Sequence, residues 1–347
     1  MELPLGQFLK KCEINELGDA FQIQLSIGFP LSAKNKELII QDIIKELVSE
    51  LSLTKPVEIT IDSEIHTHQV QTNQASHQRI KNIILVASGK GGVGKSTVTA
   101  NLALALKLQG AKIGILDADI YGPSQPQIFA QYDSPEMIHE KKFKPLKAHG
   151  IEMISIGNLV NIDSAMIWRG PMVSQALMQM LRDTQWSDLD YLFIDLPPGT
   201  GDIQLTIAKQ VPVSASIVVT TPQDLSLLDA RRAIEMFRKV KISVLGLVEN
   251  MSTFICPSCG EVSDIFGSHG AKRLSGNVEI PVLGQIPLEL QIRKDTDAGC
   301  PTVEKNPDSQ TALSYINIAL ALSAHLSLRS KNYNRNIPQT KVEFSKE

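Results

Sequence analysis

The sequence lacks both a strong net charge and an apolar run long enough to cross a membrane. Its formal net charge is −3 over 347 residues. This gives no basic field for a polyanion, so we expect no nucleic-acid partner. No apolar run approaches the ~20 residues that a bilayer span requires, so we expect no membrane partner either. The N-terminal segment lacks the apolar core of a signal peptide, which predicts a cytoplasmic protein.

Cysteine is also scarce, with four residues in the chain. In a reducing compartment, cysteines serve as ligands or core side chains rather than as a disulfide framework. Cys256 and Cys259 form a C-x-x-C pair within the sequence CPSCG. Cys12 and Cys300 stand alone, and we interpret them as structural or incidental thiols.

Hydrophobic periodicity predicts a small α/β unit at the N-terminus. Residues 21–29 alternate between apolar and polar side chains as in a half-buried strand, residues 36–51 carry a helical apolar stripe, and residues 57–61 alternate again. The chain is long enough to bury a sizeable core in two domains. We predict a small domain over 1–64, a polar linker over 65–79, a nucleotide-binding domain over 80–330 and a disordered tail over 331–347.

The predicted linker contains three histidines, and a histidine-rich tract can bind metal. No carboxylate or cysteine cluster accompanies them, so we favour solvated polar residues as the interpretation. These histidines are His66, His68 and His77.

From about residue 80 to residue 328, apolar strand candidates alternate with helical patterns. This order is typical of a doubly wound, mostly parallel α/β sheet, in which ligands bind outside the carboxyl ends of the strands. Functional side chains are therefore expected where the strands stop. The predicted strand ends are Asp117, Ser155, Asp195, Thr220, Asn250 and Gln285.

The sequence GKGGVGKST, residues 89–97, fits the phosphate-binding loop G-x-x-x-x-G-K-[ST] and lies between a buried-strand run and a helical pattern. Its glycines let successive backbone N–H groups form an anion nest at a helix N-terminus. Lys95 is expected to reach the β- and γ-phosphates of ATP, and the Ser96 hydroxyl to ligate Mg²⁺. The predicted nucleotide-binding residues of the loop are Gly89, Lys90, Gly91, Gly92, Val93, Gly94, Lys95, Ser96 and Thr97.

Polar side chains follow three of the predicted strands. Asp117 and Asp119 are expected to hold the magnesium shell, with Asp119 orienting the attacking water, although an Asp at a strand end can also cap a turn. Asp195 is expected to reach Mg²⁺ through a water. Asp202, a few residues later, is expected either to cap the next helix or to take part in catalysis. Asn250 carries a donor and an acceptor suited to the adenine edge, and a turn asparagine is its ordinary alternative.

The C-x-x-C pair lets two thiolates converge on one metal ion or one cluster, but zinc and a [4Fe–4S] cluster each need about four ligands. The sequence contains no second C-x-x-C. A twofold homodimer would complete the ligand set, because an isologous interface brings the same pair from each subunit together. A thioredoxin-like redox pair and two inert thiols are the alternatives.

Together these motifs resemble the Mrp/ApbC family of iron–sulfur cluster carrier ATPases, which belong to the MinD/ParA group with a deviant phosphate loop. The resemblance spans about residues 80–301 and rests on GKGGVGKST, DADIYGPS, WRGPM, DYLFIDLPPGTGD, VENMS and CPSCG. It implies that Lys90 crosses a dimer interface to the partner's nucleotide and that Asp119 positions water. It also implies that Asp195 belongs to the magnesium-binding strand. The catalytic residues implied in this way are Lys90, Lys95 and Asp119.

The resemblance further implies that Cys256 and Cys259 share a bridging iron–sulfur cluster, of the [4Fe–4S] type, with their dimer mates. The N-terminal unit looks like the small iron–sulfur assembly domain often fused to these ATPases, in shortened form. Residues 28–33, GFPLSA, fall where many relatives carry a cysteine and contain none. We therefore interpret this unit as a docking or target-recognition module.

The motifs and the resemblance predict a homodimeric ATPase, slow and regulatory, that passes its cluster to apo iron–sulfur proteins, with cluster scaffold proteins as further partners. One alternative is a MinD/ParA-type positioning ATPase, which needs an amphipathic membrane helix or a basic DNA patch. The other is an ATP-driven electron donor resembling the nitrogenase iron protein, whose bridging cysteines come from distant loops. The apolar segment 313–328 is interpreted as a helix packed on the sheet rather than as a membrane anchor.

Overall fold

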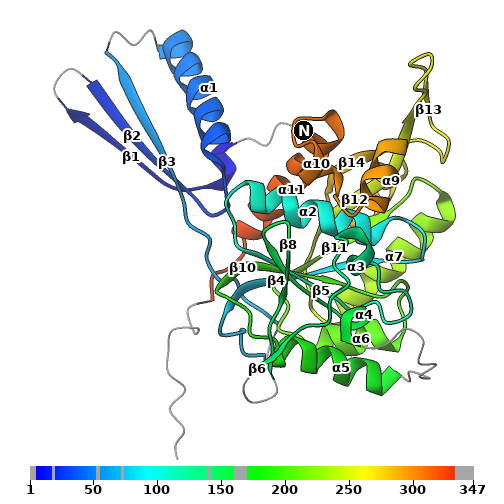
Figure 1. Cartoon of the computed structure of the whole chain (residues 1–347). Coiled ribbons are helices and arrows are strands. Elements are labelled where there is room, and N and C mark those ends of the chain that lie inside the picture. The colour runs from blue at the N-terminus through cyan, green and yellow to red at the C-terminus, as the bar shows by residue number, and fades with distance from the viewer. Residues whose placement is uncertain are drawn as a thin grey trace, which may run out of the picture.

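The N-terminal unit is a three-stranded sheet covered on one face by a helix (Figure 1). The computed structural model describes residues 5–17, 20–51, 55–71, 74–138, 142–159 and 170–332. Strand β1 pairs antiparallel with β2, whereas β3 pairs parallel with β2 through a crossover helix, as a parallel pair requires. The unit comprises a 3₁₀ turn (Leu5–Phe8), β1 (Leu9–Leu17), β2 (Ala20–Ile27), α1 (Ala33–Leu51) and β3 (Val57–Ser63).

This unit packs against the C-terminal helix α11 (Gln310–Ser327). The ring of Phe8 meets the rings of Phe29 and His325 edge to face, with centroids 6.2 and 5.7 Å apart. A Cβ atom added to Gly28 would lie 2.8 Å from Ser327 Cβ. The segment that lacks a cysteine therefore forms part of an interface in which only glycine fits at position 28.

The N-terminal unit also contacts the far end of α2 (Lys95–Leu108), the helix that follows the phosphate loop. The Oε1 atom of Gln109, at the C-cap of α2, accepts hydrogen bonds from Ser32 N at 3.0 Å and from Asn35 Nδ2 at 2.8 Å. Gln109 is buried. The two units thus share a polar contact as well as an apolar one.

The large unit is built on a sheet in which nine strands of the described residues take part (Figure 1). Their order is β13-β12-β11-β4-β10-β5-β9-β8, with β14 also paired to β12. All neighbours are parallel except β8 with β9 and β13 with β12, which confirms the predicted fold class. The strands are β4 (Ile80–Ser88), β5 (Ile113–Asp117), β8 (Leu146–Ala148), β9 (Ile151–Ser155), β10 (Leu189–Asp195), β11 (Ala215–Thr220), β12 (Val244–Ile255), β13 (Val262–Ser263) and β14 (Val282–Leu288), and a separate ribbon pairs β6 (Met137–Ile138) with β7 (Lys142–Phe143).

Helices cover both faces of this sheet and bury two apolar clusters (Figure 1). Helices α2, α10 and α11 lie on one face, and the segment predicted as a packed helix is the buried α11. No helix in the described part of the chain is long and apolar enough to cross a membrane. Trp168 and Arg169 of the WRGPM motif lie outside the described residues. The other helices are α3 (Gln125–Ile128), α4 (Ile156–Leu159), α5 (Gly170–Asp183), α6 (Asp202–Gln210), α7 (Asp224–Lys239), α8 (Gly270–Val278), α9 (Leu290–Asp297) and α10 (Thr302–Lys305).

Four of the six predicted strand ends match the structure, and two were wrong. Strand β12 continues past Asn250 to Ile255, and β14 continues past Gln285 to Leu288. The backbone of β12 takes a left-handed conformation at Met251, with φ of 56°, which marks the kink that the sequence suggested as an end. Beyond it, β12 pairs with β13 and carries the C-x-x-C segment.

The solvated character predicted for the linker histidines was wrong for His68, which is 2% exposed. Its Nδ1 atom lies 2.9 Å from Asn82 Oδ1. The backbone of His68 bridges to Lys331, and Asn332 N donates to Thr67 O at 2.8 Å. The first two residues of the predicted tail therefore pair with the linker, while residues 333–347 lie outside the described residues.

Burial lowers the pKa of His68 below its ordinary value, and the nearby charges of Lys10, His66 and Arg329 lower it further. The unfolded chain therefore binds more protons than the folded chain as the pH falls below about 6.5. We predict that stability decreases in this range and that His68 accounts for part of the decrease. The fall in melting temperature between about pH 7.5 and about pH 5.5 measures this decrease. His68→Gln should show a smaller fall in Tm than the wild type, and an equal fall in both would contradict the prediction.

Candidate functional site

The phosphate loop, residues 89–94, connects β4 to the N-terminus of α2. Gly92 and Gly94 have φ of 82° and 80°, a left-handed conformation that glycine adopts without strain. A Cβ atom at Gly89 would lie 2.1 Å from the backbone carbon of Asp229 in α7. These glycines therefore let the backbone turn and approach its neighbour closely, as an anion nest at a helix N-terminus requires.

Lys95 and Asp195 form a buried ion pair at the centre of the site, with 6% and 0% of their side chains exposed. Lys95 Nζ donates to Asp195 Oδ1 and lies 3.3 Å from Ser96 Oγ. Thr99 Oγ1 donates to the same carboxylate oxygen at 3.2 Å. The structure thus brings together the predicted phosphate lysine, the predicted magnesium hydroxyl and the acid at the end of β10.

Asp117 shapes the loop that follows β5. Its carboxylate accepts hydrogen bonds from the backbone N–H of Asp119 and of Gln125, both at 3.1 Å, and from Ser155 Oγ at 2.9 Å. Burial, with the charge of Asp195 adding to it, raises the pKa of Asp117 to about 7. Its three observed donors therefore come from the loop after β5, the start of α3 and the end of β9, and its assignment to the cofactor stays a prediction.

Asp119 and Gln125 present two buried oxygens that have no donor within the described residues, namely Asp119 Oδ1 and Gln125 Oε1. Burial raises the pKa of Asp119, and the charge of Lys95 opposes this effect. Together with Ser96 and Asp195 these residues provide an all-oxygen donor set, which is the chemistry that Mg²⁺ prefers. The site therefore fits the expected magnesium ion. Sequence reasoning missed Gln125, the first residue of the short helix α3, which carries no motif that marks it.

Lys90 lies apart from this cluster. Its Nζ atom donates to Gln223 Oε1, just before α7, at 3.2 Å. The Lys90 carbonyl accepts a hydrogen bond from Ser88 Oγ at 2.9 Å. Its side chain therefore lies on the α7 side of the loop, and its predicted role across a dimer interface stays a prediction.

Asn250 contacts the phosphate loop directly. Its Nδ2 atom donates to Val93 O at 2.9 Å. A Cβ atom at Gly94 would lie 2.3 Å from the same Nδ2. Asn250 therefore supports the loop backbone from β12, and base recognition by this residue stays a prediction.

Cys256 and Cys259 lie on the hairpin between β12 and β13, which projects from the large unit (Figure 1). Backbone N–H groups of Cys259 and Ser258 lower the pKa of the Cys256 thiol, which favours the thiolate that binds metals. Neighbouring apolar side chains are exposed, at 48% for Ile255 and 62% for Val262. No group of three or more His, Cys, Asp or Glu side chains in the described ranges is arranged to hold a metal ion, so the two cysteines stand as a pair.

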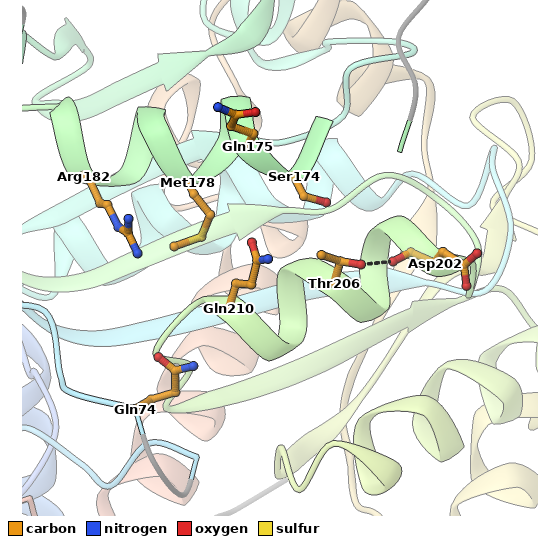
Figure 2. A pocket seen from close by; sticks show the side chains of 8 residues that line it. All are labelled: Gln74, Ser174, Gln175, Met178, Arg182, Asp202, Thr206 and Gln210. Atoms are coloured by element: carbon orange, nitrogen blue, oxygen red, sulfur yellow. Dashed lines mark hydrogen bonds between the residues drawn. The ribbon is translucent and has the colours of Figure 1, made fainter. Parts of the chain in front are cut away.

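Asp202 does not cap α6, so this expectation was wrong. Gly201 occupies the N-cap, and Asp202 is the first residue of the helix, where its charge suits the helix dipole. Figure 2 shows that Asp202 lines a groove between α5 and α6 that includes no residue of the phosphate loop. The groove has a volume of about 820 Å³ and is lined by Gln74, Ser174, Gln175, Met178, Arg182, Asp202, Thr206 and Gln210.

Comparisons with known proteins identify the family and the fold of this chain. Residues 79–323 match the ParA family model described as NUBPL iron-transfer P-loop NTPase. The chain is 46% identical over 319 residues to the iron-sulfur cluster carrier protein of Haemophilus influenzae, covering 92% of this chain and 85% of that one. A nucleotide-binding protein from Archaeoglobus fulgidus, solved with ADP, is 40% identical and has a TM-score of 0.56 over 64% of this chain and 87% of its own. The cell division ATPase MinD of Pyrococcus furiosus, 24% identical, shares the fold with a TM-score of 0.53 over 70% of this chain and 98% of its own.

We predict that Lys95→Met lowers thermal stability in the absence of added nucleotide, because it leaves the Asp195 carboxylate buried without its counter-ion. Breaking a buried ion pair on one side costs about 3–5 kcal/mol. Lys90→Met is the matched control, since the Lys90 ammonium contacts the neutral amide of Gln223. Its cost should stay within about 0.5 kcal/mol. Equal melting temperatures for the two variants in differential scanning calorimetry would refute this assignment.

Proposed function

This chain belongs to the NUBPL iron-transfer P-loop NTPases of the ParA family, and we propose that it is an ATP-hydrolysing carrier that holds an iron–sulfur cluster between two copies of itself and passes it to apoproteins. The family resemblance drawn from its motifs is confirmed. One observation supports this above all: strand β12 contacts the phosphate loop through Asn250 and leads directly into the exposed C-x-x-C hairpin.

The proposed nucleotide site lies at the N-terminus of α2. Lys95 turns from Asp195 to the β- and γ-phosphates of ATP, and Ser96 provides its hydroxyl to Mg²⁺. Thr99 keeps its hydrogen bond to Asp195 during this exchange, so the carboxylate stays in place. Bound Mg²⁺ would neutralise charge on the phosphates. The Archaeoglobus relative, solved with ADP, supports a nucleotide in this fold.

Hydrolysis is proposed to use Asp119 to orient the attacking water. Its buried carboxylate has one oxygen without a donor in the described part of the chain, and this oxygen is available to accept a hydrogen bond from water. Lys90 of the partner subunit would reach the phosphates after leaving Gln223. We propose slow, regulatory turnover, because the site residues that the structure describes suggest no phosphoryl acceptor other than water.

The cluster is cargo, and we propose that it binds the thiolates of Cys256 and Cys259. Two thiolates from each subunit supply the four ligands of a [4Fe–4S] cluster. The exposed side chains of Ile255, Val262 and Ile265 flank the pair and would be covered by a second hairpin. This fits an isologous dimer, in which the same patch meets itself.

We propose that nucleotide binding acts on the cluster through β12. Asn250 contacts the loop at Val93 O, and Cys256 follows the end of the same strand beyond the left-handed residue Met251. A shift of the loop backbone would therefore reach the hairpin within a few residues. We further propose that apo iron–sulfur proteins and cluster scaffold proteins are recognised by the N-terminal unit.

Anaerobic reconstitution with iron and sulfide tests the cluster site. We expect the wild type to form a dimer that takes up a cluster, and Cys256→Ala and Cys259→Ala each to lose it, as measured by absorption and paramagnetic resonance. Cys300→Ala is the matched control and should retain the cluster. Uptake of zinc alone by the wild type, or a full cluster in both C-x-x-C variants, would exclude the proposed carrier function.

Nucleotide binding and turnover separate the roles of the two lysines. We expect Lys95→Ala to weaken ATP binding by about tenfold or more, because a charged hydrogen bond to phosphate is lost. Lys90→Ala should bind ATP like the wild type but release phosphate more slowly. Fluorescent ATP titrations and phosphate-release assays measure the two effects. Equal loss of binding in both variants would argue against a role for Lys90 across the dimer.

A further inference from the structure

Gln125 is a fully buried polar side chain that joins three elements of the candidate site. Its Nε2 atom donates to Asp195 Oδ2 at 2.8 Å and to the Ser96 carbonyl oxygen at 3.1 Å. Its backbone N–H donates to Asp117 Oδ2 at 3.1 Å. The start of α3 is thus tied to the end of β5, the end of β10 and the first turn of α2.

These contacts determine how the amide of Gln125 faces. Asp195 Oδ2 and Ser96 O accept hydrogen bonds and cannot donate them. If the Gln125 amide were flipped by about 180°, its Oε1 would face these two acceptors with no hydrogen between them. Both N–H groups of the amide are therefore used. The opposite atom, Oε1, is buried and receives no hydrogen bond from any residue that the structure describes. Buried side-chain oxygens of this kind nearly always have a donor, which points to a ligand.

The orphaned oxygens require a ligand that donates hydrogen bonds. Asp119 Oδ1 is a second buried acceptor without a donor among the described residues. The phosphate oxygens of ATP only accept hydrogen bonds, so the phosphates satisfy neither oxygen. Hydrated Mg²⁺ keeps several of its waters when it binds to proteins, and those waters donate. A water of the magnesium shell therefore matches Gln125 Oε1, and Asp119 Oδ1 is the acceptor assigned above to the attacking water.

We infer that Gln125 is a positioning residue for magnesium, an inference that rests on the nucleotide site proposed above. Its Nε2 holds the Asp195 carboxylate and the Ser96 backbone in one arrangement. Its Oε1 accepts a hydrogen bond from a metal-bound water. A methionine at position 125 would fill a similar volume and provide neither contact, whereas a glutamate would turn a third acid toward Asp195.

Titration with Mn²⁺ in the presence of ADP tests this role, with free Mn²⁺ followed by paramagnetic resonance. We expect Gln125→Met to weaken Mn²⁺ binding about tenfold to a hundredfold, as loss of a residue that orients metal ligands does. Its affinity for ADP in EDTA should equal that of the wild type. Gln127→Met is the matched control, because Gln127 lies on the same helix, is exposed and bonds to Tyr132. It should bind Mn²⁺ like the wild type.

The outcomes separate this role from the proposed function. If Gln125→Met binds Mn²⁺ as tightly as the wild type, the inference is overturned and the nucleotide site still stands. The same holds if the variant loses only stability, or only its affinity for ADP in EDTA. A wild-type chain that binds neither ADP nor Mn²⁺ overturns both. Circular dichroism reports folding of the variant. If Gln125→Met does not fold, Gln125→Asn, which is too short for both contacts, takes its place with the same expected loss.

Discussion

The site depends on the burial of acidic side chains at one edge of a parallel sheet. Strands β5 and β10 are neighbours, and their register places Asp117 opposite Asp195. Repulsion between two buried acids is severe in a medium of low polarity, and Lys95, Thr99 and backbone N–H groups compensate it. Lys95 is therefore the counter-ion of Asp195 as well as the proposed ligand for phosphate. It can leave Asp195 only when another positive charge replaces it, and a divalent cation entering with the nucleotide meets this requirement.

Much of this arrangement could be predicted because local sequence signals determine it. The apolar runs that end at Asp117 and Asp195 are sharply bounded, which predicts where these strands stop. The spacing of glycines and lysine in the phosphate loop is compatible with few structures other than a phosphate-binding turn between a strand and a helix. The extension of β12 beyond Asn250 could not be predicted, because it depends on pairing with β13. The burial of His68 depends on Asn82 and Lys331, far along the chain. Gln125 escaped notice because a glutamine at the start of a four-residue helix has no sequence pattern that distinguishes it.

Helix α2 connects the phosphate loop to the N-terminal unit. Its first residue is Lys95, and its C-cap residue, Gln109, receives hydrogen bonds from Ser32 and Asn35. The helix spans about 21 Å at 1.5 Å per residue. Any tilt of α2 that accompanies phosphate binding therefore displaces the surface on which the N-terminal unit rests. The apolar contact with α11 at Phe8 and Phe29 would move together with it, since α11 packs on α2.

The C-x-x-C hairpin contributes nothing to the buried apolar clusters of the large unit, because none of residues 254–265 belongs to them. Its side chains are therefore not needed to fill the core of the large unit. Mutations there can alter the proposed metal site, the length of the tip or its exposed surface without removing any side chain from those clusters. Evolution could in this way change what the hairpin binds while the P-loop unit keeps its fold.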